Sequence, residues 1–431
     1  MNAGLVVIIL LVGLSILGIP IFLSLGIATA IGVQMLGLPF VMIPQKMFTG
    51  MDSSALMAIP FFILAGNIMS RSITGKLINV SDALIGWIKG SLGIVTVLAS
   101  ALFGAISGSA VATVSAVGGI TIPAMKKQGY GAPFASAVAS MASVLGPLVP
   151  PSIPLIVYAS ITEISVSKLF ISSVIPALIL VTFLIVYMLW YGKKHDLPAN
   201  ERKSGKEIWI TIKKSIWALL MPVIIMGTIF GGICTATESA VISVIYAIVI
   251  SVFVYRDMKW SELPKLIIDA GISTATIMVL VGLSKASSYV VTTSRLPQLV
   301  STTFTSITDS KILILVLVNV LFLILGMLME ANSAVIMMTP ILLPLVKVFG
   351  VDPIQFGMIM CLNLYIGLMT PPVGLSLLLG NKIADCKIGD SIKAALPMLG
   401  LGLLLLLMVT YIPPLTLALP MPGRLTSCCI L

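Results

Sequence analysis

Four polar interruptions in long apolar stretches are the parts of this chain best suited to bind small charged molecules. Two are runs of small or polar residues, 104–109 (GAISGS) and 326–333 (GMLMEANS). The other two end in a Pro-Pro pair, 146–151 (GPLVPP) and 367–372 (GLMTPP). An interrupted helix leaves backbone carbonyls that suit a hard cation such as sodium, and backbone amides that suit a carboxylate. The pattern therefore favours oxygen ligands for a hard cation and amide donors for a carboxylate.

The interruptions are repeated along the chain. The second Pro-Pro run begins 221 residues after the first, and two further prolines recur at that offset, Pro123 with Pro344 and Pro176 with Pro397. Matched breaks over this length indicate one structural unit used twice. A single break would favour a simple kink between packed helices. In a membrane protein, matching interruptions in two halves instead point to the binding site of a secondary transporter.

Composition places these interruptions in a lipid bilayer. With 58% hydrophobic and 9% charged residues, the 431-residue chain is expected to be a polytopic membrane protein. The net charge of +10 lies in short loops, which indicates membrane orientation rather than nucleic-acid binding. The five cysteines form no CxxC pattern and have no histidine partners, so we expect no disulfide framework and no transition-metal site.

Sequence motifs of catalysis are missing. The chain has no Walker A sequence and no GxSxG or HExxH motif. We therefore expect a transport protein rather than an enzyme.

The expected fold is an all-α polytopic membrane protein built from two inverted-topology repeats, with about ten crossings plus two re-entrant helical hairpins. Each hairpin segment is too short for two spans of about 20 residues, and non-helical backbone at membrane depth must be buried in protein or face a cavity. Basic residues place the central connection in the cytoplasm and, with an odd number of crossings per repeat, both termini in the periplasm. In chain order we expect repeat one over 1–192 with its hairpin at 91–126, a cytoplasmic basic connection over 193–214, repeat two over 215–420 with its hairpin at 311–347, and a polar tail over 421–431.

Three polar residues near the interruptions invite separate interpretations. Glu330 lies in an apolar run, where a carboxylate is costly and functional by default, although it also suits a helix cap. Glu238 follows Thr235 at capping-box spacing, which favours a structural role. Ser152 begins a new half-helix after the first Pro-Pro pair, where free amides favour a carboxylate.

Over residues 1–420 the sequence resembles the large membrane subunit of TRAP (tripartite ATP-independent periplasmic) transporters, the DctM-like family, and is most similar to its sialic-acid members. The resemblance rests on five groups of residues: Ser107-Gly108-Ser109-Ala110, Gly146 to Ser152, Gly231-Gly232 with Thr235 to Ala240, Met329-Glu330 with Thr339 to Pro344, and Gly367 to Gly374. Many relatives have Asp at the position of Glu330, so the longer side chain is a departure from the family pattern.

The resemblance implies sodium-driven import of an organic anion across the bacterial inner membrane by an elevator mechanism, as in the ion transporter superfamily. Sialic acid is favoured and a C4-dicarboxylate is next. The implied partners are a small four-helix membrane subunit and a periplasmic substrate-binding protein. Substrate contacts are expected from Ser107, Ser152 and Glu330. Sodium ligands are expected from the tips and the facing breaks, at Ser107, Gly108, Ser109, Gly146, Pro150, Met329, Asn332, Ser333, Gly367 and Thr370.

Two alternatives remain open at this point. One is an autonomous sodium symporter of the same superfamily that needs no binding protein. The other is a membrane scaffold or channel without coupled uptake, which would have no need of paired interruptions.

Overall fold

The computed structural model describes residues 2–199, 202–296, 298–299, 310–370 and 374–421, and every regular element among them is helical. This confirms the expected all-α fold. Seven helical stretches in the described chain are long and apolar enough to cross a membrane, and six shorter apolar helices have 10 to 17 residues. Pro371, Pro372 and the predicted polar tail from residue 422 lie outside the described residues.

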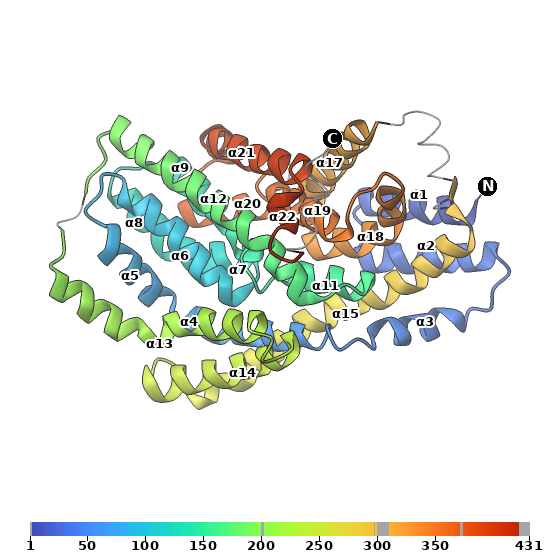
Figure 1. Cartoon of the computed structure of the whole chain (residues 1–431), viewed down its shortest axis with the longest axis horizontal. Coiled ribbons are helices and arrows are strands. Elements are labelled where there is room, and N and C mark those ends of the chain that lie inside the picture. The colour runs from blue at the N-terminus through green and yellow to red at the C-terminus, as the bar shows by residue number, and fades with distance from the viewer. Residues whose placement is uncertain (1, 200–201, 297, 300–309, 371–373, 422–431) are drawn as a thin grey trace.

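The first half contains five helices, a hairpin, an interrupted helix and one long helix (Figure 1). Their bounds are α1 Ala3–Ile16, α2 Ile21–Met35, α3 Met42–Met51, α4 Ala58–Ser72, α5 Thr74–Ile85, α6 Ser91–Ser107, α7 Ala110–Thr113, the π-helix η1 Val114–Gly118, α8 Gly119–Lys127, α9 Ala132–Ser143, α10 Leu145–Leu148, α11 Ile153–Thr162 and α12 Val166–Lys194.

The second half repeats the order of hairpin, interrupted helix and long helix. Its elements are α13 Gly205–Phe230, α14 Ala236–Val249, the π-helix η2 Ile250–Val254, the 3-10 helix η3 Trp260–Glu262, α15 Leu263–Thr293, α17 Lys311–Leu328, α18 Ala331–Val348, α19 Pro353–Gly367, α20 Leu375–Ala384, α21 Ile388–Tyr411 and α22 Pro414–Leu417. The order of elements agrees with a duplicated unit, and the inverted orientation of the repeats stays a prediction.

Both predicted hairpin segments fold as helix, break and returning helix. In the first, α6 runs to the tip and α7, η1 and α8 return beside it (Figure 1). Gly108 makes the reversal in a left-handed conformation with φ 62°, and its amide donates to the Gly104 carbonyl at 3.0 Å. A side chain at Gly108 would also place Cβ 2.5 Å from the Pro151 carbonyl oxygen. Only glycine meets both demands.

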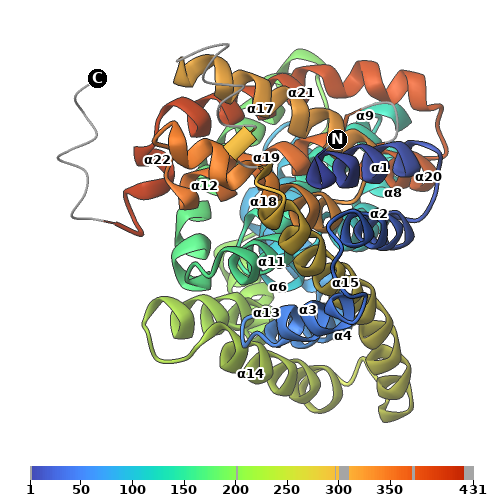
Figure 2. The same ribbon diagram turned by 90° about the vertical axis from the view of Figure 1, so that its right-hand side faces the viewer.

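Interrupted helices occupy the centre of the molecule. Residues 134–143 of α9 and 354–367 of α19 are buried without exception. In the two orthogonal views, α13 and α14 lie along one side of this centre and α17 and α21 along the opposite side (Figures 1 and 2). The outer helices thus enclose the segments whose hydrogen-bonding ladders are broken, as a bilayer requires.

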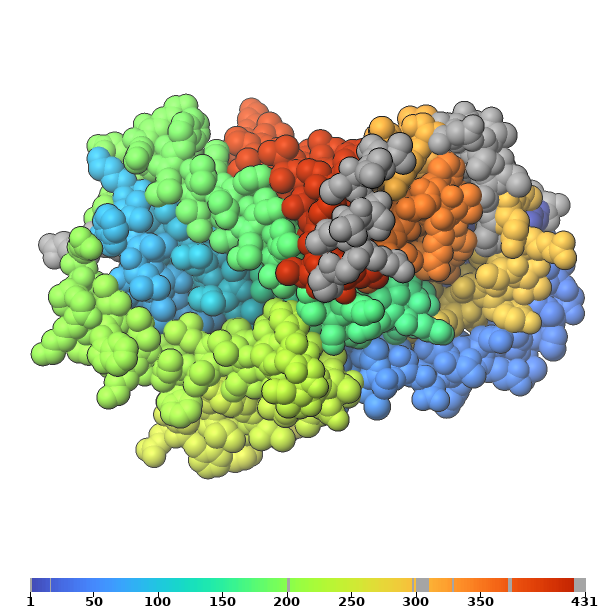
Figure 3. All heavy atoms as spheres, in the orientation of Figure 1, coloured from blue at the N-terminus to red at the C-terminus, as the bar shows by residue number. Residues whose placement is uncertain are grey.

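The outer helices present apolar side chains outward. The segment from α13 to α14 forms the lower edge of the face in Figure 3 and carries exposed residues such as Trp217, Val223 and Ile245. Such a surface suits contact with lipid chains or with another membrane subunit.

Ion pairs hold the ends of the polar connection between the halves. Lys203 pairs with Asp82 at 2.6 Å, and Lys89 pairs with Asp196. The hydrogen bond from Lys89 lowers the pKa of the Asp196 carboxyl below its ordinary value. Helix α12 ends at Lys194 and α13 begins at Gly205. The non-helical part of the connection is therefore shorter than the polar segment 193–214.

Candidate functional site

Both hairpin tips and both helix interruptions meet around one small cavity of about 50 Å³. That volume accommodates a small ion or a few water molecules. The lining residues come from four parts of the chain: Gly108, Ser109, Ala110 and Val111 at the first tip, Pro147 in the first break with Ile153 and Pro154 at the start of α11, Glu330, Ala331 and Asn332 at the second tip, and Tyr365 near the end of α19 with Leu368 in the second break. Segments more than 200 residues apart are therefore brought together, which the repeat pattern alone did not specify.

A close crossing of two glycines supports each tip. A Cβ at Gly104 would lie 2.7 Å from the Cα of Gly146, and a Cβ at Gly367 would lie 2.5 Å from the Cα of Gly326. The hairpin helix and the interrupted helix therefore touch backbone to backbone in both halves. Gly146 and Gly367 were expected to be sodium ligands. Neither residue lines the cavity, and each instead allows the close approach that supports a tip.

The first tip is neutral and rich in hydroxyl groups. Ser109 caps α7 by accepting a hydrogen bond from the Ala112 amide at 3.3 Å, and Thr113 donates to the Ser109 carbonyl at 2.7 Å. The hydroxyls of Ser107 and Thr113 are 3.4 Å apart in the buried interior. The helix widens into a π-helix directly after Thr113, a feature often found at functional sites. Ser109 thus faces the cavity, whereas Ser107 lies behind it.

The second tip carries a carboxylate. Glu330 caps α18 by accepting from the Ser333 amide at 3.2 Å, and its other oxygen accepts from the Asn332 side-chain amide at 2.6 Å. The predicted cap is thus present. The amide oxygen of Asn332 is buried and has no donor among the described residues, and no described Lys or Arg forms an ion pair with Glu330. An unpaired carboxylate beside an unsatisfied buried oxygen is an environment that favours a cation.

Glu238 provides a contrast with Glu330. Its carboxylate accepts from the Thr235 amide at 2.8 Å, and its own amide donates to the Thr235 hydroxyl at 3.3 Å. The predicted capping box is confirmed, and Glu238 does not line the cavity.

Ser152 precedes α11, but its hydroxyl does not cap that helix. It shares a hydrogen bond of 2.9 Å with the Tyr365 hydroxyl, and both residues are fully buried. Tyr365 comes from α19 and lines the cavity, so this bond joins the two halves beside the first turn of α11. The sequence analysis missed Tyr365. A hydroxyl-bearing aromatic residue five positions before Thr370 in the second break was the available signal.

The remaining predicted site residues lie around the tips rather than in the cavity lining. Thr370 follows the end of α19, and its hydroxyl donates back to the Ile366 carbonyl of that helix at 2.8 Å. Ser333 lines a separate apolar cavity of about 560 Å³ between α2 and α15. Met329 follows α17 as its C-cap and Pro150 lies in the first break, and neither residue lines the cavity. Among the described residues, no group of three or more His, Cys, Asp or Glu side chains is placed to hold a metal ion.

The fold matches that of a known helical membrane transporter. The crystal structure of the YdaH transporter of Alcanivorax borkumensis superimposes with a TM-score of 0.61, covering 88% of this chain and 89% of that one at 14% sequence identity. At this identity the likeness shows the fold alone.

Family membership follows from the sequence comparisons. Residues 7–415 match the family model "Tripartite ATP-independent periplasmic transporter, DctM component". The chain therefore belongs to the DctM family of TRAP transporter subunits, as its resemblance predicted. Its relatives are named as transporter permeases, which places the chain among transport proteins.

Three named relatives show the range of the family. The C4-dicarboxylate TRAP transporter large permease DctM of Pseudomonas aeruginosa is 41% identical, covering 87% of this chain and 88% of the relative. The isethionate TRAP transporter permease DctMQ of Oleidesulfovibrio alaskensis is 38% identical over 92% of this chain, which spans only 63% of that protein's length. The sialic acid TRAP transporter large permease SiaM of Vibrio cholerae is 34% identical, covering 95% of this chain and 96% of the relative.

Proposed function

We propose that this chain is the large membrane subunit of a sodium-coupled importer of an organic acid. The observation that carries the proposal is the cavity between the tips, where Glu330 and the Asn332 amide oxygen present acceptors without a cationic partner. Sodium is the cation we assign to them, since carbonyl, carboxylate and hydroxyl oxygens suit a hard ion. Ser109 and nearby tip carbonyls would complete its ligands.

The anion is assigned to the opposite wall of the cavity. Ile153 and Pro154 form the first turn of α11 there, and the positive end of a helix dipole favours a carboxylate. The hydroxyls of Ser152 and Tyr365 add donors beside it. Ser107, which lies behind the first tip, would act on the substrate only through the tip backbone.

Charge supplies the coupling in this proposal. An organic acid entering near Glu330 meets a second negative charge at short range, and like charges repel. A sodium ion bound at the second tip cancels that repulsion, so each ligand favours binding of the other. Movement of the loaded tips past the outer helices, as in an elevator, would carry both across the membrane. The cavity is too small for a sugar acid in this conformation, so the tips must separate to load one.

The order of candidate substrates follows the relatives. The relative at 41% identity is named for C4-dicarboxylates, and the one at 34% for sialic acid. We therefore propose a small organic acid, with C4-dicarboxylates tested first and sialic acid second, which reverses the order expected from resemblance. We also propose that the chain acts in the inner membrane with both termini periplasmic, beside a small membrane subunit and a periplasmic binding protein.

Uptake into proteoliposomes tests this function. The chain would be reconstituted with its small subunit, an inward sodium gradient imposed, and candidate binding proteins added singly with C4-dicarboxylate, sulfonate or sialic acid. Accumulation that needs both sodium and a binding protein supports the proposal. Accumulation without any binding protein would establish an autonomous symporter, and no sodium-dependent accumulation with any substrate would refute sodium coupling.

A further inference from the structure

A third and larger cavity lies between α5 and α13 and is lined by four cationic side chains. Its volume is about 690 Å³, and the cations are Arg71, Lys76, Lys203 and Lys214. Most of its other lining residues are neutral and polar, and no carboxylate belongs to the described lining. A polar, cationic hollow of this size has room for an organic acid or a phosphate headgroup.

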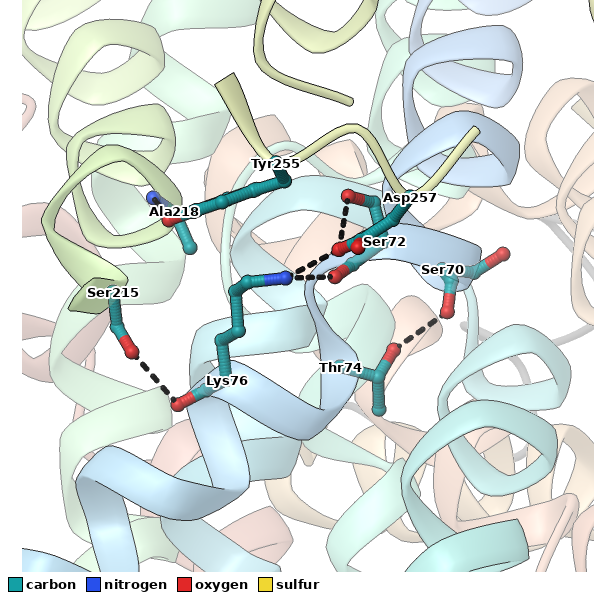
Figure 4. A network of polar contacts seen from close by, with 8 residues as sticks. All are labelled: Ser70, Ser72, Thr74, Lys76, Ser215, Ala218, Tyr255 and Asp257. Atoms are coloured by element: carbon teal, nitrogen blue, oxygen red, sulfur yellow. Dashed lines mark hydrogen bonds and ion pairs between the residues drawn. The ribbon is translucent and has the colours of Figure 1, made fainter. Parts of the chain in front are cut away.

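Lys76 lines this cavity, and Figure 4 shows its polar contacts. Its ammonium is 2.5 Å from the Asp257 carboxylate, donates to the Ser72 carbonyl at 3.0 Å and lies 3.8 Å from the centre of the Tyr255 ring. The Ala218 amide donates to the Tyr255 hydroxyl at 3.1 Å and so fixes the ring. A lysine held by three contacts loses little further side-chain freedom when an anion approaches it.

The ion pairs around the cavity leave positive charge in excess. Lys76 pairs with Asp257, Arg71 with Glu262 at 2.7 Å, and Lys203 with Asp82. Lys214 forms no ion pair with any described residue. The three carboxylates approach the cations from outside the lining, so the hollow itself presents one uncompensated charge to an anion.

The cavity also touches the first hairpin. Ile120, the one lining residue from α8, belongs to the returning arm of the hairpin whose tip carries Ser109. The basic connection at Lys203 marks this end of the molecule as cytoplasmic under the positive-inside rule. A cavity at this place would lie beside the route by which an anion leaves the tips.

We propose that this cavity is a separate anion-binding site that takes a carboxylate or phosphate group on the cytoplasmic side. The carboxylate source is the transported acid after its release from the tips, a reading that rests on the proposed function. The phosphate source is the headgroup of an anionic phospholipid. Lys214 supplies the uncompensated charge in either case. The opposing interpretation is that the ion pairs only fasten α4 and α5 to the second half.

The test compares Lys214→Gln with Lys213→Gln. These neighbouring exposed lysines of α13 differ in that only Lys214 lines the cavity, so both changes remove the same charge from the same helix. The complete transporter would be placed in phosphatidylcholine vesicles, and counterflow measured against increasing internal concentrations of succinate or sialic acid. If cargo is the ligand, Lys214→Gln should raise the half-saturating internal concentration by about threefold, the size of one partly exposed charge. Lys213→Gln should leave it unchanged.

A second arm addresses the lipid. Vesicles containing phosphatidylglycerol should raise the thermal unfolding temperature of the wild type and of Lys213→Gln, but not of Lys214→Gln, if a headgroup is the ligand. This arm does not require transport, so it still reports on the site if sodium-driven uptake fails. If the two variants have equal half-saturating concentrations and equal unfolding temperatures, the proposal is overturned. The ion pairs would then serve only to hold α4 and α5 against the second half.

Discussion

The two hairpins share a backbone arrangement and differ in chemistry. Each is supported by a glycine crossing, Gly104 with Gly146 and Gly326 with Gly367. The first tip reverses at left-handed Gly108 and offers hydroxyls and carbonyls. The second has no glycine at its reversal and uses the carboxylate of Glu330 as its helix cap.

The difference indicates which parts of a duplicated unit are free to diverge. Backbone contact at the crossings allows no side chain, so both halves keep glycine there. The tips face a cavity, where side chains vary without disturbing that contact. One half can therefore carry the negative charge, while the other supplies the free end of α11 beside Ser152.

The largest effect is expected from adding a methyl group at a crossing. Gly104→Ala or Gly367→Ala sets Cβ within 2.7 Å of backbone atoms, which cannot move aside as a flexible side chain can. We expect destabilisation at or above the usual overpacking range of about 1–3 kcal/mol, and little folded protein. The yield of monodisperse protein and its thermal unfolding measure this. Gly227→Ala, which meets nothing within 4 Å, is the control. Failure of only one crossing variant would show that the halves do not share this support.

The next largest effect is expected from removing the negative charge of the second tip. Glu330→Gln keeps the shape of the cap and should still lower sodium-driven uptake by about tenfold or more, equivalent to at least about 1.4 kcal/mol. Glu238→Gln is the matched control, because Glu238 also caps a helix but lies away from the cavity. Wild-type uptake by well-expressed Glu330→Gln would show that Glu330 acts only as a helix cap. The charge at the second tip would then not distinguish the two hairpins in function.

Smaller, graded effects are expected where single oxygen ligands are removed. Asn332→Ala deletes a buried oxygen without a donor and also the amide that donates to Glu330, so it should raise the sodium concentration for half-maximal uptake most. Ser109→Ala should follow, and Thr370→Ala should change least, because its hydroxyl is already bonded to the Ile366 carbonyl. Sodium titrations of uptake at fixed substrate measure the order. An unchanged requirement in both Asn332→Ala and Ser109→Ala would place sodium elsewhere.

The smallest effect is expected from removing the hydrogen bond between Ser152 and Tyr365, which joins the two halves. Tyr365→Phe leaves Ser152 without its partner, and one net hydrogen bond is worth about 1 kcal/mol. The concentration of organic acid for half-maximal uptake should rise about fivefold at that value, with an unchanged sodium requirement. Tyr158→Phe removes another buried hydroxyl bond, to the Pro353 carbonyl, away from the cavity. Equal substrate affinity in wild type and Tyr365→Phe would limit Tyr365 to packing.

Local sequence was sufficient for the helices, the two hairpins and the caps. Apolar runs of helical length must satisfy their backbone groups internally in a bilayer, so the helical class followed from composition. The reversals at Gly108 and Glu330 and the capping box at Glu238 depend on neighbours within four residues, which the sequence displays directly.

Tertiary structure decided which of those local features share a cavity. The hydrogen bond between Ser152 and Tyr365 spans 213 positions, and no local pattern encodes such a distance. Packing also placed Ser333 beside α2 and α15, away from the cavity between the tips, although its residue type suits sodium. Residue type sets what a side chain is able to bind, whereas its direction depends on how whole helices pack, and that is a property of the folded chain.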